Sequence, residues 1–166
     1  KMPITEEQTP YLYQLLRRTL TDAGLSTYTA KDHYARPRPF TVNHAPICTP
    51  EEREFLENDG SYPSGHTAIG WAWALVLAEL APEQSDAIFA RGLAYGESRN
   101  ICNVHWRSDV IQGRLMAAAT IARLHANADF RSDLEAASAE VDAMQAQGLT
   151  PSRDCAAEAA ALRKKK

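Results

Sequence analysis

The most constraining feature of the sequence is residues 60–80, GSYPSGHTAIGWAWALVLAEL, in which a turn-forming start is followed by a long apolar run. Glycine, serine and proline crowd the first part, as they do in tight turns. The run that follows His66 carries almost no charge, which is typical of a buried helix. Its longest apolar stretch, Ala68 to Ala78, is far shorter than the roughly 20 residues that a membrane-spanning helix needs. The pattern predicts a buried helix with a histidine at its first turn.

Helical patterns account for most of the remaining chain. A capping-box arrangement begins at Thr5, apolar residues then recur at helical spacing, and Gly24 is expected to end the helix. Pro50 and Pro82 stand where further helices would begin. No alternating strand pattern of any length is present. The helices predicted in this way cover residues 5–24, 50–58, 66–80, 82–97, 105–126 and 129–146.

The segment from residue 31 to residue 50 differs because it contains the prolines Pro37, Pro39, Pro46 and Pro50. Proline interrupts a helix beyond its first turn, so the segment is expected to be a long ordered loop. At 166 residues the chain is long enough for one domain with a sizeable core. We therefore expect an all-α fold, a single-domain helical bundle with a long ordered loop at about 31–50. The helical domain is expected over residues 1–147, and residues 148–166 are expected to form a solvated C-terminal tail.

The charge of the chain bears on its partners. It has 18 Lys and Arg residues against 21 Asp and Glu residues, a formal net charge of −3. The sequence lacks the basic excess that nucleic acids or anionic membrane surfaces attract, so neither is expected as a partner. No P-loop, CxxC or HExxH pattern occurs, so no nucleoside-triphosphate loop and no metal site are expected.

The three cysteines, Cys48, Cys102 and Cys155, leave two alternatives open. In a reducing compartment all would be thiols, whereas in an oxidising one two would pair and one would remain. The N-terminal residues, KMPITEEQTPYL, do not resemble a signal peptide. Spacing alone does not decide between the alternatives.

Three short segments carry residues suited to phosphoryl chemistry. They contain, in order, Lys31 with Arg38; Ser64, Gly65 and His66; and Arg99, His105 and Asp109. Each segment is weak evidence alone. Loop cations are usually solvated, a Ser-Gly-His before a helix is usually a cap, and a His/Asp pair four residues apart is usually a surface ion pair.

In combination the segments predict a phosphate site. Lys31, Arg38 and Arg99 supply cations, and arginine forks hold a tetrahedral oxyanion bidentately. Ser64 and Gly65 offer a hydroxyl and backbone N–H groups at a helix N-terminus, which binds anions readily.

The histidines would supply the reactive groups. His105 is the candidate nucleophile. Asp109, one helical turn on, would hold its other ring nitrogen and support the cation formed on attack. His66 is left to protonate the leaving oxygen. The residues therefore predict phosphoryl transfer without a metal ion.

The same three segments carry a family resemblance. KDHYARPRP at residues 31–39, PSGH at 63–66 and SRNICNVHWRSD at 98–109 match, in order, K-x6-RP, PSGH and SR-x5-H-x3-D. This signature resembles that of the type 2 phosphatidic acid phosphatase superfamily, which includes the vanadium haloperoxidases. The surrounding sequence, from about residue 3 to about residue 130, is more similar still to the soluble branch of that superfamily, the bacterial class A non-specific acid phosphatases.

The resemblance implies an all-α fold, a periplasmic or secreted location, and metal-independent hydrolysis of many phosphate monoesters through a phosphohistidine at acidic pH. It implies that phosphate is bound by Lys31, Arg38, Ser64, Gly65 and Arg99. It also implies that His105 attacks, that Asp109 supports it and that His66 is the acid. No cofactor is implied, and vanadate is expected to inhibit as a transition-state mimic. The expected partners are small phosphomonoesters and inorganic phosphate, and the oligomeric state, including a homo-oligomer, is left open.

The resemblance also bears on the cysteines and on the extent of the chain. It implies a disulfide between Cys48 and Cys102, with Cys155 unpaired. Family members usually carry further helices before the segment that begins here, so the chain is expected to lack N-terminal helices. Two alternative functions are a vanadate-dependent haloperoxidase, which is generally much larger, and a non-catalytic phosphate-binding module, which would not need His105 and Asp109.

Overall fold

The computed structural model describes residues 2–148 and 154–162 of the chain. Within these residues the secondary structure is helical and contains no strand, which confirms the predicted all-α fold. The long helices are α1 (Pro10–Leu25), α5 (Gly65–Leu80), α6 (Ser85–Ile101), α7 (Arg107–Leu124) and α8 (Ala128–Ala146). The shorter ones are α2 (Tyr28–Tyr34), α3 (Pro39–Asn43), α4 (Arg53–Glu57) and α9 (Cys155–Leu162), with 3₁₀ turns at Pro50–Glu52 and Pro82–Gln84. None of the described helices has the length and apolar character needed to cross a membrane.

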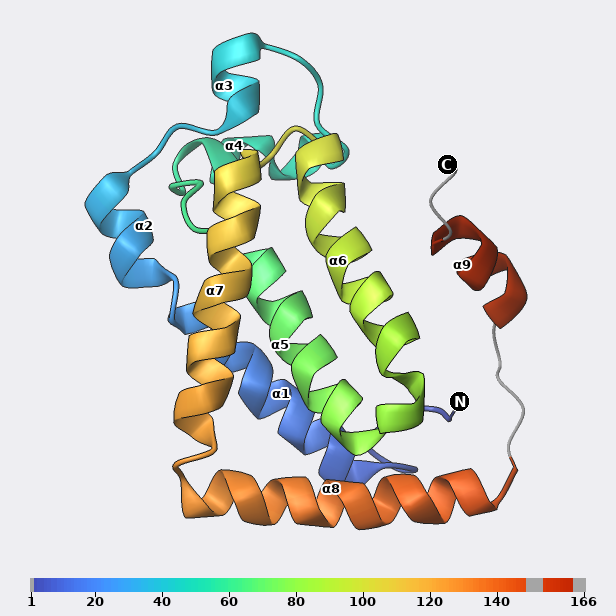
Figure 1. The fold of residues 1–166 in the computed structure, drawn as a ribbon. Coiled ribbons are helices and arrows are strands. Elements are labelled where there is room, and N and C mark those ends of the chain that lie inside the picture. The colour runs from blue at the N-terminus through green and yellow to red at the C-terminus, as the bar shows by residue number, and fades with distance from the viewer. Residues whose placement is uncertain (1, 149–153, 163–166) are drawn as a thin grey trace.

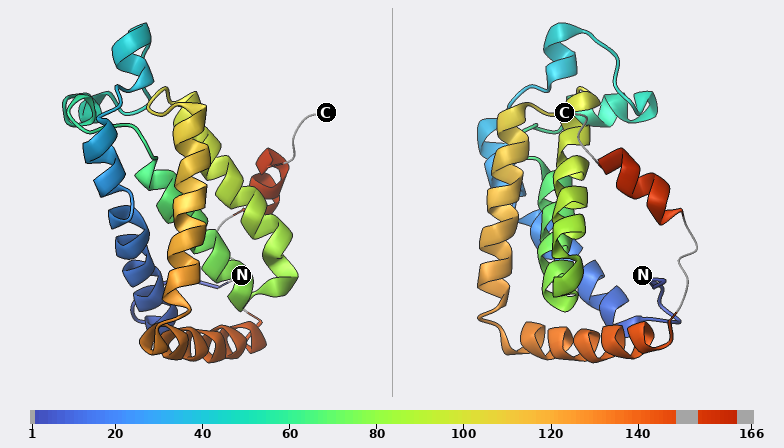
Figure 2. Two further views of the ribbon diagram at one scale, coloured as in Figure 1. Left: turned by 60° about the vertical axis from the view of Figure 1, so that its left-hand side comes forward. Right: turned by 45° about the vertical axis from the view of Figure 1, so that its right-hand side comes forward.

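Helix α5 lies at the centre of the bundle and packs against α1, α6 and α7 (Figures 1 and 2). Its Ala68, Ala72 and Val76 are fully buried in the main hydrophobic core. Side chains this small allow neighbouring helices to approach closely on several sides. The apolar run at 66–80 thus forms the buried helix that the sequence predicts.

Helix α8 crosses the end of the bundle and packs against α1 (Figure 1). Its Phe130, Ala137 and Val141 are buried in the same core as Leu12 and Leu15 of α1. Burial of this face accounts for the amphipathic pattern in the sequence of the helix.

Helix α1 begins at Pro10, later than the capping-box pattern at Thr5 predicts. The Oγ1 of Thr5 does accept a hydrogen bond from the N–H of Gln8 at 3.2 Å, but the chain forms only a turn there. Pro10 has no N–H with which to continue a helix begun earlier, and it occupies the first helical position instead. The N–H of Leu12 then donates to Glu140 of α8 at 2.9 Å, so a tertiary contact satisfies the start of the helix.

The segment at 31–50 is not a continuous loop, because the end of α2 and all of α3 lie within it. Pro39 occupies the first position of α3, where the fixed φ of proline suits a helix and its missing N–H has no cost. The prolines therefore prevent a long helix, as predicted, but allow short ones. Lys31 accordingly lies on α2 and not in a loop.

A disulfide joins Cys48, after α3, to Cys102, at the end of α6, with the Cα atoms 5.0 Å apart. This is the pairing that the family resemblance implied, and Cys155 is free. Beside the bridge lies a second core cluster, formed by Phe40, Ile47, Leu56 and Val104. Together they hold the segment after α3 against the connection between α6 and α7.

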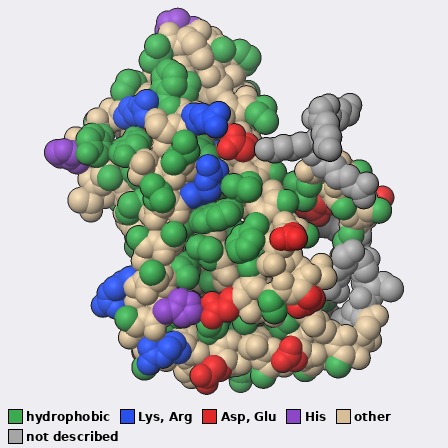
Figure 3. Space-filling model, in the orientation of Figure 1, with side chains coloured by type: hydrophobic (Ala, Val, Ile, Leu, Met, Phe, Trp, Pro, Cys, Tyr) green, Lys and Arg blue, Asp and Glu red, His purple; other side chains and the backbone are tan. Residues whose placement is uncertain are grey.

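The face seen in Figure 3 carries many hydrophobic side chains over α6 and α7. On α6 and α7 the side chains of Leu93, Ile111 and Leu115 are exposed, so no described segment of the chain covers them.

The part of the C-terminal tail that the structure describes forms α9, whose side chains are mostly exposed. Its Glu158 pairs with Arg91 of α6 at 3.1 Å, and both side chains of this ion pair are themselves exposed. Exposed ion pairs of this kind contribute little to stability.

Candidate active site

The three motif segments meet where α5 and α7 begin and α6 ends. Five of their polar residues are almost completely buried: Lys31 is 5% exposed, Arg38 3%, Ser64 0%, His105 3% and Asp109 0%. Burying a charge costs free energy unless the charge is paired or bound. Lys31 and Arg38 are therefore not the solvated cations that each motif alone would suggest.

The start of α5 is built around Ser64, its N-cap. The Oγ of Ser64 accepts hydrogen bonds from the N–H and the hydroxyl of Thr67, at 3.2 and 2.9 Å. The N–H of Ser64 donates to the carbonyl of Asp109 at 3.0 Å, which joins the start of α5 to α7. This approach requires Gly113, because a Cβ there would lie 2.5 Å from the Ser64 carbonyl oxygen. Gly65 is the first residue of α5, so its N–H is among those that a helix leaves free for an anion.

His105 lies in the connection between α6 and α7, because α6 extends past its predicted end and α7 begins only at Arg107. The prediction that a helix begins at His105 is therefore wrong. Hydrogen bonds fix the connection instead. The N–H of His105 donates to the carbonyl of Arg99 at 3.2 Å, and the side chain of Asn100 donates to the carbonyl of His105 at 2.9 Å.

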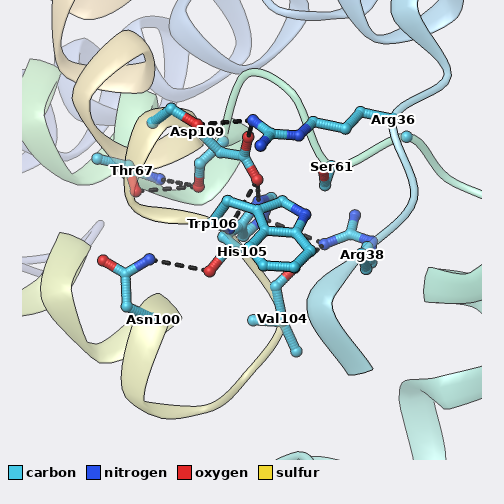
Figure 4. A network of polar contacts seen from close by, with 12 residues as sticks. Arg36, Arg38, Ser61, Thr67, Asn100, Val104, His105, Trp106 and Asp109 are labelled. Atoms are coloured by element: carbon cyan, nitrogen blue, oxygen red, sulfur yellow. Dashed lines mark hydrogen bonds and ion pairs between the residues drawn. The ribbon is translucent and has the colours of Figure 1, made fainter. Parts of the chain in front are cut away.

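The imidazole of His105 lies between a cation and an anion (Figure 4). Its Nε2 is 3.2 Å from NH1 of Arg38, and its Nδ1 is 3.5 Å from Oδ2 of Asp109, which is long for a hydrogen bond. Burial lowers the pKa of His105 to about 4, and the carboxylate of Asp109 opposes this only in part. The ring is therefore neutral above about pH 4 and keeps a lone pair on one nitrogen.

The carboxylate of Asp109 is held from two sides (Figure 4). Its Oδ2 accepts the N–H of Trp106 at 2.8 Å, which caps the start of α7, and its Oδ1 accepts from Arg36 at 2.7 Å. The guanidinium of Arg36 also lies over the ring of Trp106, 5.5 Å from its centroid. The sequence pattern alone does not single out Arg36, although it stands inside the first motif, between Lys31 and Arg38.

His66 is the second residue of α5, and its side chain remains exposed to solvent. Partial desolvation by the atoms around the ring lowers its pKa from the ordinary value of 6.5, and the charge of Arg99 lowers this pKa further. The Nε of Arg99 is buried and has no hydrogen-bond partner in the described part of the chain. A buried donor without a partner is costly, so Arg99 marks a place for an acceptor that the chain itself does not supply.

Lys31 and Arg38 both pair with a residue that the sequence analysis missed, Asp59. Its Oδ2 lies 2.9 Å from Nζ of Lys31 and 2.7 Å from NH2 of Arg38. A single acidic residue in a polar turn gives no distinguishing signal in the sequence. The structure thus brings the predicted residues together and adds Arg36, Asp59 and Asn100 as polar partners.

Three cationic side chains of the motif segments lie at the site. Within residues 2–148 and 154–162, no group of three or more His, Cys, Asp or Glu side chains is arranged to hold a metal ion. The charges of Lys31 and Arg38 lower the pKa of both histidines, and the charge of Arg99 lowers the pKa of His66.

Residues 11–133 of the chain match the PAP2 superfamily. The chain is 47% identical over 139 residues to a non-specific acid phosphatase of Providencia stuartii, covering 83% of this chain and 56% of that protein. It is 46% identical over 144 residues to an acid phosphatase of Zymomonas mobilis, covering 87% and 54%. It is 42% identical over 132 residues to a non-specific acid phosphatase of Salmonella typhimurium, covering 79% and 53%. The chain thus spans about half the length of the curated relatives it matches.

Proposed function

The chain belongs to the PAP2 superfamily, and from that premise we propose that it is an acid phosphatase that works without a metal ion, through a phosphohistidine on His105. One observation carries the proposal: the buried ring of His105, with Nε2 3.2 Å from Arg38 and with a pKa lowered to about 4. A neutral imidazole beside a cation is a nucleophile placed where an anionic phosphate would be held. The names of the relatives support the same class of reaction.

The substrates proposed are small phosphate monoesters, because the site offers charge for a phosphate group. Arg38 and Arg99 would hold its oxygens through their N–H groups, with Lys31 adding a point charge. The N–H groups of Gly65 and His66, in the first turn of α5, would bind another oxygen. Donors fixed in place before the reaction stabilise the charge of the transition state without reorganising.

The reaction proceeds in two transfers. Nε2 of His105 attacks phosphorus, the bond from phosphorus to the ester oxygen breaks, and His66 gives its proton to the departing oxygen. The imidazolium formed on His105 is stabilised by Asp109, whose carboxylate Arg36 orients through a 2.7 Å contact. Water then attacks the phosphohistidine while His66 takes its proton, which releases inorganic phosphate and restores His105. Vanadate, as a trigonal bipyramid on Nε2, would mimic both transition states.

The exposure of His66 fits this role. The leaving alcohol must depart toward solvent, and His66 is the site histidine that solvent reaches, whereas His105 is 3% exposed. An acid whose pKa is lowered also gives up its proton more readily.

We further propose a periplasmic or secreted location. The disulfide between Cys48 and Cys102 supports it, because disulfides persist in oxidising compartments and are rare in the cytosol of mesophiles.

Hydrolysis of p-nitrophenyl phosphate by this chain is expected to persist in excess EDTA, because side-chain cations and helix N–H groups neutralise the phosphate. The initial rate is measured before and after dialysis against EDTA and again after Mg²⁺ or Zn²⁺ is added back. A rate that appears only with an added divalent cation would contradict the proposal.

The pH profile of kcat/KM is expected to be bell-shaped with an acidic optimum. His105 must be neutral to attack, so activity is lost as the pH falls through its pKa of about 4. His66 must be protonated to act as the acid, so activity is lost as the pH rises through its pKa, which lies below 6.5. Steady-state kinetics with an alkyl phosphate between pH 3 and about pH 9 would check both limbs. An optimum above neutral pH would show that these assignments are wrong.

A further inference from the structure

Asp59 joins cations that come from separate parts of the fold. Lys31 lies on α2 and donates to Oδ2 of Asp59 at 2.9 Å and to the carbonyl of Gly60. Arg38 precedes α3 and donates to the same Oδ2 at 2.7 Å. The turn that contains Asp59 and Gly60 lies close against α2, since a Cβ at Gly60 would be 2.8 Å from the carbonyl oxygen of Lys31. One carboxylate oxygen therefore holds two side chains that are predicted to bind phosphate.

The guanidinium of Arg38 presents different edges to different partners. Its Nε donates to the carbonyls of Leu56 and Asp59 at 2.8 and 2.9 Å, and its NH2 donates to Oδ2 of Asp59. Asp59 thus takes the edge formed by Nε and NH2. NH1 donates to the carbonyl of Val104 at 3.0 Å and lies 3.2 Å from Nε2 of His105. NH1 is therefore the end of the guanidinium directed at the nucleophile, and a phosphate oxygen would take the N–H that points at Nε2 of His105.

Asp59 also stabilises the charged forms of Lys31 and Arg38. The side chains of Lys31 and Arg38 are 6% and 3% exposed, and that of Asp59 is 24% exposed. Burial lowers the pKa of Lys31 and of Arg38, and in both cases the charge and hydrogen bond of Asp59 oppose the shift. Removing the carboxylate would leave buried cations without this partner.

We propose that Asp59 is a positioning residue for phosphate binding. It holds one edge of Arg38 and the ammonium of Lys31, so that their remaining donors meet the transferring phosphoryl group beside His105. This inference rests on the proposed function. The opposite role would be a carboxylate that competes with phosphate for the same cations, and the two roles predict opposite effects when its charge is removed.

The test compares Asp59→Asn, which keeps a side-chain oxygen as acceptor, with Asp59→Ala, which keeps none. Dissociation constants for inorganic phosphate, from calorimetry, and inhibition constants for vanadate are measured for the wild-type chain and both variants. Both constants are expected to rise by about tenfold in the Asn variant and about a hundredfold in the Ala variant. Tighter binding in the variants would show a competing carboxylate, and unchanged constants would equally overturn the proposal.

Glu57→Gln serves as the matched control. It removes one negative charge two residues away, on an exposed side chain that pairs with Arg53 at 2.9 Å, and phosphate binding is expected to be unchanged. The free energy of unfolding in urea is measured for every variant. A merely structural role would lower that free energy without the graded loss of phosphate affinity. If Asp59→Ala does not fold, the Asp59→Asn variant alone distinguishes the two roles: a higher dissociation constant for phosphate supports positioning, and a lower one supports competition.

Phosphate binding by the wild-type chain distinguishes failure of the role proposed for Asp59 from failure of the proposed function. If it binds phosphate and the Asp59 variants bind phosphate equally well, the role of Asp59 fails while the proposed function stands. If the wild-type chain binds neither phosphate nor vanadate, the proposed function fails and the role of Asp59 fails with it.

Discussion

Replacing His105 with alanine is expected to abolish turnover and to lower kcat/KM by more than about 10⁴-fold, because no atom remains to form the bond to phosphorus. Wild-type enzyme mixed with labelled substrate and quenched rapidly is expected to hold phosphate that is labile in acid and stable in base. The His105→Ala variant is expected to hold none. Rapid-quench trapping followed by separation of protein-bound label measures both results.

His125→Ala is the control for this experiment. His125 lies at the opposite end of α7 and pairs with Glu79 at 3.2 Å, remote from the buried ring of His105. This control variant is expected to retain both turnover and trapped label. Label found on the His105→Ala protein, or on His66 in the wild type, would require a different nucleophile.

The start of α5, where the proposed phosphate site lies, could be predicted from the sequence because it depends on local structure. Ser64 caps α5 and Gly65 is its first residue, as a serine and a glycine before an apolar helix suggest. Chain order and spacing were enough to group Lys31, Arg38 and Arg99 with them, because a phosphate site needs several cations near one helix N-terminus. The motifs thus identified most of the residues that the structure brings together at the candidate site.

Asp59 and Arg36 could not be predicted in the same way, because their roles exist only in the folded chain. Asp59 meets Lys31 across 28 residues of sequence, and Arg36 meets Asp109 across 73. An isolated charge in a polar segment is usually solvated, so neither residue stands out before the segments are brought together.

The boundaries of the helices also depend on contacts between distant segments, which the local sequence does not reveal. The start of α1 depends on Glu140 of α8, and the path of the chain at 31–50 depends on contacts with the turn before α5. His105 was expected within a helix because 105–126 has a helical pattern. The carboxylate of Asp109 instead accepts the N–H of Trp106 and starts α7 after the histidine. The local sequence pattern therefore predicts the long helices well but predicts poorly where each of them begins and ends.

Replacing His66 with alanine is expected to have an effect that depends on the leaving group. An alkyl alcohol departs as a strongly basic oxygen and needs the proton, so kcat/KM for an alkyl phosphate is expected to fall by roughly 10²–10⁴-fold. p-Nitrophenolate is weakly basic and departs without help, so kcat/KM for p-nitrophenyl phosphate is expected to fall far less. Steady-state kinetics on both substrates at one acidic pH measures the ratio of the two losses.

Two further observations make this test specific to proton donation by His66. The variant is expected to form the phosphoenzyme from p-nitrophenyl phosphate, because His105 and the cations around it are intact. The pH profile of its kcat/KM for the alkyl phosphate is also expected to lose the alkaline limb. The imidazole of His66, whose lowered pKa causes that limb, is absent from the variant. His66 is exposed, so its removal leaves the buried contacts of Ser64 and Asp109 in place, and the start of α5 keeps its cap. Equal losses on the two substrates would mean that His66 binds the phosphate and does not protonate the leaving oxygen.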